Sequence, residues 1–568
     1  FEILIYIWIS YKNILKQKTF IKPLILLLFF SIESLYTQKI NLKISSVNKN
    51  EVTILNKIKY QKKHIDTTSI NFEINKISKY LKNIGYFTNT IDSLVKTKNN
   101  YLAYFSLNEK INQSEIYVKL KDQYLFSGFE FTNNTINIAI EKLQSILLNI
   151  SKKIDLEGKS FSKIQLKNIK IKDKKLFAEL SIEASSKRII NKVVVKGYDD
   201  FPKSFLKNHY KIKINSVFNE KKIKSISEIS KNLQIVSEIK TPEVLFTKDS
   251  TFLYLYLKKR KNNSFDGLIN FATKENGDLL LNGNIDLELN NILNTGEKFK
   301  LFWNKIADER QEFEIALKTP YIFNSKITPE LSFSIYKQDS TFLNTKFDSK
   351  IFYNLNTKIK FALTYNSESS INLDKRIENN IENFSNYFLG FQFEFVVPKN
   401  DFFFNNKILL KINPSIGERN LNSNSTNQIK IETTASYIWE LNSRNSIYIK
   451  NTNGFFKSNT YLNNELFRIG GPKSIRGFNE QSIFVDQYIM INLEYRFLTS
   501  EKSYLYTITD FAKTATLENT KNLNSLGLGF LFINKNSLIN ISSSIGRNES
   551  EKFDFKNAKL LVSWKKFF

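Results

Sequence analysis

The chain has 568 residues, a formal net charge of +28, a mean hydropathy of −0.31 and no cysteine. This length predicts several domains, and the hydropathy is too low for a protein that crosses a membrane with many helices. Without cysteine, disulfides, thiolate metal sites and cysteine nucleophiles are excluded. The lysines are scattered along the chain and form no basic stripe with interleaved aromatics, so we expect no nucleic-acid partner.

The first 37 residues have the pattern of an export signal. Four lysines between Lys12 and Lys22 precede a short apolar run at 23–30. A basic segment followed by such a run predicts a secretory signal peptide, and the run is too short to span a bilayer comfortably. We therefore assign 1–37 to a signal peptide with an upstream extension, with a membrane anchor as the alternative.

The next 225 or so residues predict α/β repeats. The clearest unit, 188–260, has a strand that alternates around Val193, two amphipathic helical segments and two further strands, in the order β-α-α-β-β. Weaker copies lie at 70–108 and 115–184, and in the latter we predict a helix over 135–150. One irregular α/β domain is the alternative. The boundaries we assign to the three repeats are 38–112, 113–186 and 187–262.

From residue 263 onward the apolar residues recur with period 2. In YIMINLEYRF, for example, Ile491 and Leu493 share one face while Asn492 and Glu494 share the other. About sixteen such strands, joined by Asn- and Ser-rich turns, predict an antiparallel transmembrane β-barrel over 263–568. Its first and last strands are expected at 264–273 and 557–567. A soluble β-sandwich gives similar alternation and is the alternative.

The segment GGPKSIRGF, at 470–478, concentrates three of the 17 glycines of the chain. Gly470 and Gly471 permit positive φ and close packing, and Pro472 stiffens the following step, so the loop can fold back on itself. Arg476 carries a permanent charge on a rigid fork of donors, which suits a buried carboxylate. Inside a barrel such a cation would be costly unless it were paired.

These segments together resemble the BamA/TamA superfamily of outer-membrane-protein assembly factors, in which POTRA repeats precede a barrel. The resemblance is carried by RIINKVVVKGYDD at 188–200, GNIDLELNNILNTGEKFKLFW at 283–303, GGPKSIRGF and the terminal Phe568. Two departures are Lys566, where the family's C-terminal signal has an apolar residue, and the presence of three repeats instead of five.

The resemblance implies a functional site in the barrel lumen. In the family this loop folds into the lumen, and its arginine contacts acidic residues on the next two strands. The matching loop positions here are Gly470, Gly471, Arg476, Gly477 and Phe478, and the matching partners are Glu494 and Asp510; Phe568 matches the C-terminal barrel signal.

The resemblance also implies a function. The expected protein lies in the bacterial outer membrane, with its repeats in the periplasm. It receives unfolded β-barrel clients, assisted by accessory lipoproteins or chaperones, and inserts them into the lipid bilayer at the seam between its first and last strands. A two-partner secretion pore is the alternative, and a structural surface barrel is a third. We expect no enzyme, cofactor or metal site, since no nucleophile–base pattern occurs and His64 and His209 are far apart.

Overall fold

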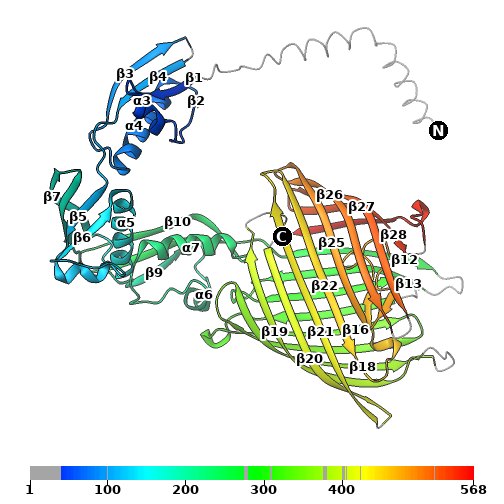
Figure 1. The fold of residues 1–568 in the computed structure, drawn as a ribbon. Helices are drawn as coiled ribbons and strands as arrows, with labels where there is room; N and C mark the ends of the chain where they lie inside the picture. Colours follow the sequence, from blue (N-terminus) through cyan, green and yellow to red (C-terminus); the bar gives the residue numbers. More distant parts are fainter. Residues whose placement is uncertain are drawn as a thin grey trace, which may run out of the picture. The chain divides into compact units, whose positions relative to one another are not determined.

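The structure, a computed structural model, describes residues 40–568 apart from 99, 274–278, 307–309, 375–379, 400–402, 404–405, 423, 517–518 and 550. The predicted signal peptide lies outside the described residues. The chain forms two compact units, 1–187 and 188–568. The first unit contains two α/β repeats, and the second contains a third repeat and a barrel (Figure 1). Within the described part, we find no helix with the length and apolarity needed to cross a membrane.

The first repeat packs its long helix on a mixed sheet of four strands, in the order β2-β1-β4-β3, with β1 parallel to β4. The helix α4 lays Ile70, Ile77 and Leu81 on the sheet because these residues recur at helical spacing. Asp66 caps it, accepting a hydrogen bond of 2.7 Å from the Ser69 amide. The elements are β1 (Ile40–Ser45), α3 (Lys49–Leu55), β2 (Lys63–His64), α4 (Thr67–Asn83), β3 (Thr90–Thr97) and β4 (Asn100–Ser106).

The second repeat corrects part of the sequence prediction. The helix predicted over 135–150 begins only at Ile140, and the five residues before it form a strand, β6, that pairs with β5. The reason is that Ile136 and Ile138 alternate with period 2 and are both buried in the sheet. The elements are β5 (Gln113–Tyr117), the 3₁₀ helix η1 (Leu120–Leu125), β6 (Thr135–Ala139), α5 (Ile140–Leu156), β7 (Lys163–Lys172) and β8 (Lys175–Glu183).

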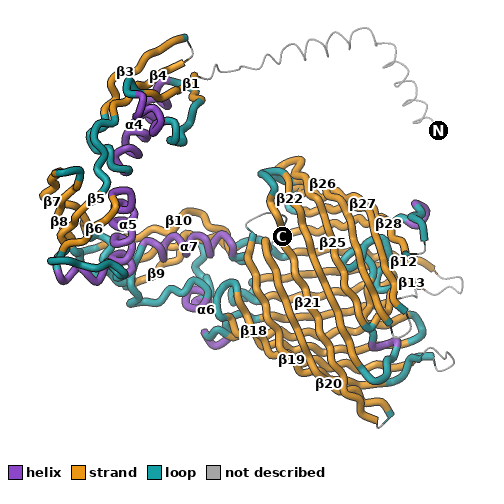
Figure 2. Tube along the Cα trace, in the orientation of Figure 1, coloured by secondary structure: helices purple, strands orange, loops and turns teal. Residues whose placement is uncertain are grey.

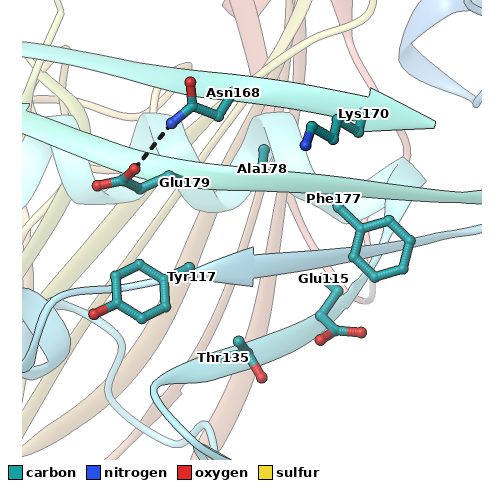
Figure 3. A pocket seen from close by; sticks show the side chains of 8 residues that line it. All are labelled: Glu115, Tyr117, Thr135, Asn168, Lys170, Phe177, Ala178 and Glu179. Carbon is teal, nitrogen blue, oxygen red and sulfur yellow. Dashed lines mark hydrogen bonds between the residues drawn. The ribbon is translucent and has the colours of Figure 1, made fainter. Parts of the chain in front are cut away.

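One face of this second sheet is left open by the helix. Figure 3 shows the hollow there, of about 250 Å³, in which Asn168 of β7 donates a hydrogen bond of 3.2 Å to Glu179 of β8. The strand order β6-β5-β8-β7 leaves β7 at an edge of the sheet.

The third repeat has the predicted order β-α-α-β-β. Its sheet runs β10-β11-β9, and its core gathers Phe201, Phe205, Ile226 and Leu255. Gly197 ends the first strand with a φ of +85°, which only glycine adopts readily. The elements are β9 (Lys192–Lys196), α6 (Lys203–Asn208), α7 (Glu220–Asn232), β10 (Val236–Phe246) and β11 (Thr251–Lys259).

The barrel confirms the predicted fold class, with sixteen antiparallel strands that close between β12 and β29 (Figures 1 and 2). The first strand has the predicted bounds, and the last begins at Lys559 because 555–557 form a short 3₁₀ helix, η4. The strands are β12 (Ser264–Thr273), β13 (Leu279–Asn290), β14 (Lys298–Ile306), β15 (Arg310–Lys318), β16 (Ile327–Gln338), β17 (Phe342–Asn354), β18 (Ile359–Asn372), β19 (Phe384–Pro398), β20 (Asn406–Leu421), β21 (Asn424–Glu440), β22 (Asn445–Lys457), β25 (Gln487–Ser500), β26 (Ser503–Ala515), β27 (Thr520–Asn534), β28 (Ser537–Asn548) and β29 (Lys559–Phe567).

The predicted alternation separates the two faces of the barrel wall. Apolar side chains such as Leu363, Ile489 and Trp564 are exposed on the outside, whereas polar side chains such as Asn492 and Glu494 are buried on the inside. An outward apolar face with every strand paired to its neighbours is the architecture of barrels that lie in an outer membrane.

The third repeat and the barrel share a hydrophobic core. The Phe205 ring lies 4.9 Å, centroid to centroid, from the ring of Tyr321, in the turn between β15 and β16. The Nδ1 atom of His209 and the Tyr321 hydroxyl are 2.8 Å apart, and the Tyr198 hydroxyl accepts a hydrogen bond of 2.8 Å from the side chain of Asn291. Burial raises the pKa of Tyr321 to about 12. Burial, aided by the charge of Lys360, lowers the pKa of His209 to about 4.

We predict that this contact weakens in acid. A histidine whose pKa is lower when buried than its ordinary value of 6.5 is destabilising below pH 6.5, because the opened state binds a proton that the closed state does not. The free energy of opening α6, measured by hydrogen exchange corrected for intrinsic rates, should fall by as much as roughly 3 kcal/mol between pH 6.5 and 4. The variant His209→Gln should lose this slope, and an equal slope in both proteins would contradict the assignment.

Candidate functional site in the barrel lumen

The longest described connection of the barrel, residues 458–486 between β22 and β25, packs inside the wall. We call it the lumenal loop. It contains the 3₁₀ helix η3 (Asn463–Glu465) and the strand pair β23 (Phe467–Ile469) and β24 (Ile483–Val485). Ile475 of the loop is buried in a cluster with Met490, Ala512 and Leu523, which belong to β25, β26 and β27.

The three glycines of the loop lie where another residue would have a strained backbone or a side chain that clashes. Gly470 and Gly471 have φ values of +112° and +90°, and the Gly471 amide donates a hydrogen bond of 3.0 Å to the carbonyl of Ile475, which closes the turn. Gly477, with a φ of +82°, lies against Gly546 of β28, where a Cβ would collide with the backbone. A Cβ on Gly546 would in turn collide with the Phe478 ring.

At the tip of the loop, Arg476 is bound by both of the carboxylates named from the sequence. Its Nε and one terminal nitrogen donate to the two oxygens of Asp510, over 2.8 and 2.6 Å. Its other terminal nitrogen donates to Glu494 over 2.5 Å, and its backbone amide donates to Asp510 over 3.0 Å. Fork-like binding of this kind fixes the orientation of the guanidinium as well as its position. We call these three residues the tip site.

A second arginine, to which the sequence analysis assigned no role, completes the charge balance. Arg496 of β25 donates to the remaining oxygen of Glu494 over 2.8 and 2.7 Å, and its guanidinium lies 4.0 Å from the centre of the Tyr448 ring. Two arginines thus face two carboxylates, so the buried charges compensate one another.

The tip site holds a permanent cation. Burial on its own would lower the pKa of the Arg476 guanidinium, but the hydrogen bonds and charges of Asp510 and Glu494 outweigh it and raise the pKa above its usual range. Release of the loop tip therefore cannot be driven by deprotonation of the arginine at physiological pH.

The seam between the first and last strands is the second candidate feature. Only Ser264–Phe567 and Phe265–Lys566 are paired across it, and the amide of Phe568 donates to the carbonyl of Asn263 over 3.0 Å. Every other pair of neighbouring strands in the barrel is joined by at least eight residue pairs. Phe568 thus lies at the end of the seam where β12 begins, and Lys566 faces the outside of the wall near the chain terminus.

The interactions described in the lumen are hydrogen bonds and ion pairs that bind and position the lumenal loop. Among the described residues, no group of three or more histidine, cysteine, aspartate or glutamate side chains is placed to hold a metal ion. His64 and His209 lie in different repeats and different compact units.

No protein-family model matches the chain, and a search of curated proteins finds no significant relative. Solved structures with a similar arrangement include BamA from Haemophilus ducreyi lacking POTRA domains 1–3, with 13% identity over 80% of this chain and 98% of that one and a TM-score of 0.46. CdiB from Escherichia coli has 13% identity over 87% and 98% of the two chains, with a TM-score of 0.49. CdiB from Acinetobacter baumannii has 14% identity over 81% and 90%, with a TM-score of 0.48.

The fold and the site define a class of protein: a closed sixteen-stranded barrel of the outer-membrane type, preceded by α/β repeats and crossed by an arginine-bearing loop. The order of domains predicted from the sequence, α/β repeats followed by a barrel, is confirmed.

We predict that Arg476→Ala destabilises the barrel. The substitution leaves the fully buried Asp510 without its paired cation, at a cost of about 3–5 kcal/mol. The measurement is the temperature at which the barrel loses its compact mobility on an unboiled gel. Arg444→Ala, on an exposed turn, is the matched control and should melt like the parent. If Arg476→Ala also melted like the parent, the tip site would have no structural role.

Proposed function

We propose that this protein is an outer-membrane assembly factor of the BamA/TamA type, which receives unfolded barrel precursors at its repeats and inserts them at its seam. The observation that carries the proposal is the seam itself. It holds two residue pairs, whereas each of the other strand contacts holds at least eight. The protein would act by binding and templating, with no enzymatic step and no cofactor.

A weakly paired seam could promote client insertion because unpaired backbone groups at an open strand edge are unfavourable in lipid. Backbone groups that face hydrocarbon without a partner cost several kcal/mol each, so an opened seam strongly favours any strand that can pair with it. A client hairpin could add to β12 or β29 and keep its own backbone paired while it enters the bilayer. The folding of the client would supply the free energy, and no nucleotide would be needed.

The repeats offer open strand edges that suit an unfolded client. In each sheet one hairpin strand lies at the edge, namely β3, β7 and β10, and all of β3 is exposed. An extended segment can add to such an edge through main-chain hydrogen bonds, which depend little on the amino-acid sequence of the client. Broad acceptance of this kind fits a factor that serves many clients, with accessory lipoproteins or chaperones as further partners.

The alternative, a two-partner secretion pore, requires an axial path through the lumen. The lumenal loop spans that path, since Glu480 binds Arg310 of β15 over 3.0 Å while Arg476 binds Asp510 of β26. A path through the wall at the seam requires no movement of this loop, which favours insertion over secretion.

The first test is client folding. Liposomes containing the protein should speed the folding of a urea-unfolded outer-membrane barrel, followed by its mobility on an unboiled gel, relative to empty liposomes and to liposomes with an unrelated barrel. An equal rate in all three would contradict an insertase. An equal rate together with a large ion conductance would favour the secretion pore.

A second test closes the seam covalently. The chain has no cysteine, so Ser264→Cys with Phe567→Cys creates a single disulfide across the seam, at residues that face each other. Oxidation should abolish the acceleration of client folding, and reduction should restore it, because the edge must open to accept a client strand. The matched control joins β28 to β29 through Ile541→Cys and Val562→Cys, and it should work in both states. Full activity of the oxidised seam variant would rule out the seam as the insertion site.

A further inference from the structure

The lumenal loop also binds the barrel wall at a site on strands other than those of the tip site. Arg419 of β20 has no exposed side-chain surface, and it forms an ion pair with Glu465 of η3, whose side chain is 1% exposed. The guanidinium also donates to the carbonyl of Thr460 over 3.2 Å and to its hydroxyl over 2.5 Å.

Both oxygens of the Glu465 carboxylate are in use. One accepts a hydrogen bond of 2.9 Å from the Leu462 amide as well as the ion pair with Arg419. The other accepts a hydrogen bond of 3.0 Å from the side chain of Gln428, on β21. We call Arg419, Gln428, Thr460 and Glu465 the root site, because they hold the segment by which the loop leaves β22.

A chain of amide contacts extends the root site along the wall. Asn464 donates to the hydroxyl of Ser370 on β18 over 2.7 Å, and Asn344 on β17 donates to the carbonyl of Asn464 over 2.7 Å. The root of the loop is therefore bound to β17, β18, β20 and β21, whereas the tip site uses β25 and β26. The two sites share no residue.

The two sites differ in what stays paired when they open. At the tip, Glu494 keeps Arg496 as a partner if Arg476 leaves, whereas Asp510, which has no exposed side-chain surface, loses its cation. At the root, Arg419 is the only cation paired with Glu465 among the described residues, and opening the pair would strand two buried charges.

We propose that the root site is the anchor that keeps the lumenal loop across the barrel and closes the lumen to axial passage even when the tip site is released. Arg419 is thus a positioning residue: it fixes the path of the loop, and Arg476 fixes only its end. The part of the loop between the two sites also contacts the wall, because the Arg468 guanidinium lies 3.7 Å from the centre of the Tyr336 ring on β16. This inference does not depend on which clients the barrel serves.

The test is ion conductance of the full chain in planar bilayers. The double variant Arg419→Met with Glu465→Leu replaces both charges by apolar groups, so that no uncompensated charge stays buried. We expect it to raise the open time of the pore by roughly tenfold or more over the parent, because the apolar pair makes none of the hydrogen bonds that hold Thr460 and Leu462. Arg476→Ala leaves the root site intact and should raise the open time less than the double variant does. Compact mobility on an unboiled gel verifies that each barrel is folded.

Two results would overturn the inference: a folded double variant that conducts like the parent, or an Arg476→Ala barrel that conducts as much as the double variant. If the double variant does not fold, Arg419→Lys decides. It keeps the charge but lacks the fork that reaches Thr460 and Glu465 together. A clear rise in its open time supports the root anchor, and conductance equal to that of the parent overturns it.

Discussion

The constraint on which the rest of this structure depends is the pairing of every strand edge in the barrel wall. A sheet that lies in lipid has no water to satisfy its backbone groups, so it must close on itself. Here fifteen strand contacts are long and one is short, with two residue pairs between β12 and β29. Closure thus creates a single place where the wall can open at low cost, and the proposed insertion of client strands follows from that asymmetry.

Closure also creates a lumen into which polar side chains point, and the lumenal loop turns that lumen into a packed interior. Buried charges there must be paired to be tolerated, and arginine pairs better than lysine because its fork reaches two acceptors at once. Only ten of the 83 basic residues of the chain are arginines, yet five of them, Arg310, Arg419, Arg468, Arg476 and Arg496, hold the loop or its partners. Because arginine is scarce in this chain, composition could have marked these arginines as candidate lumenal residues, although residue spacing did not identify them.

The third repeat and the barrel share one hydrophobic core. Phe205 and His209 share a core with Tyr321, while the first two repeats form a compact unit of their own. The third repeat therefore continues into the barrel through a shared hydrophobic core.

The sequence by itself determined the local features of this protein. Period-2 alternation marked the strands and their inward faces, including Glu494, and glycine placed the turn at Gly470. The helix prediction was wrong at 135–139. These residues precede a helical pattern, but they form a strand because they pair with β5. Only the tertiary structure showed how few residues pair across the seam, and only it revealed the root site. Arg419 and Glu465 are 46 residues apart, and nothing local marks them as partners until closure of the barrel brings β20 beneath the loop. Pairing across the lumen is a property of the closed sheet, because no short stretch of chain contains both partners.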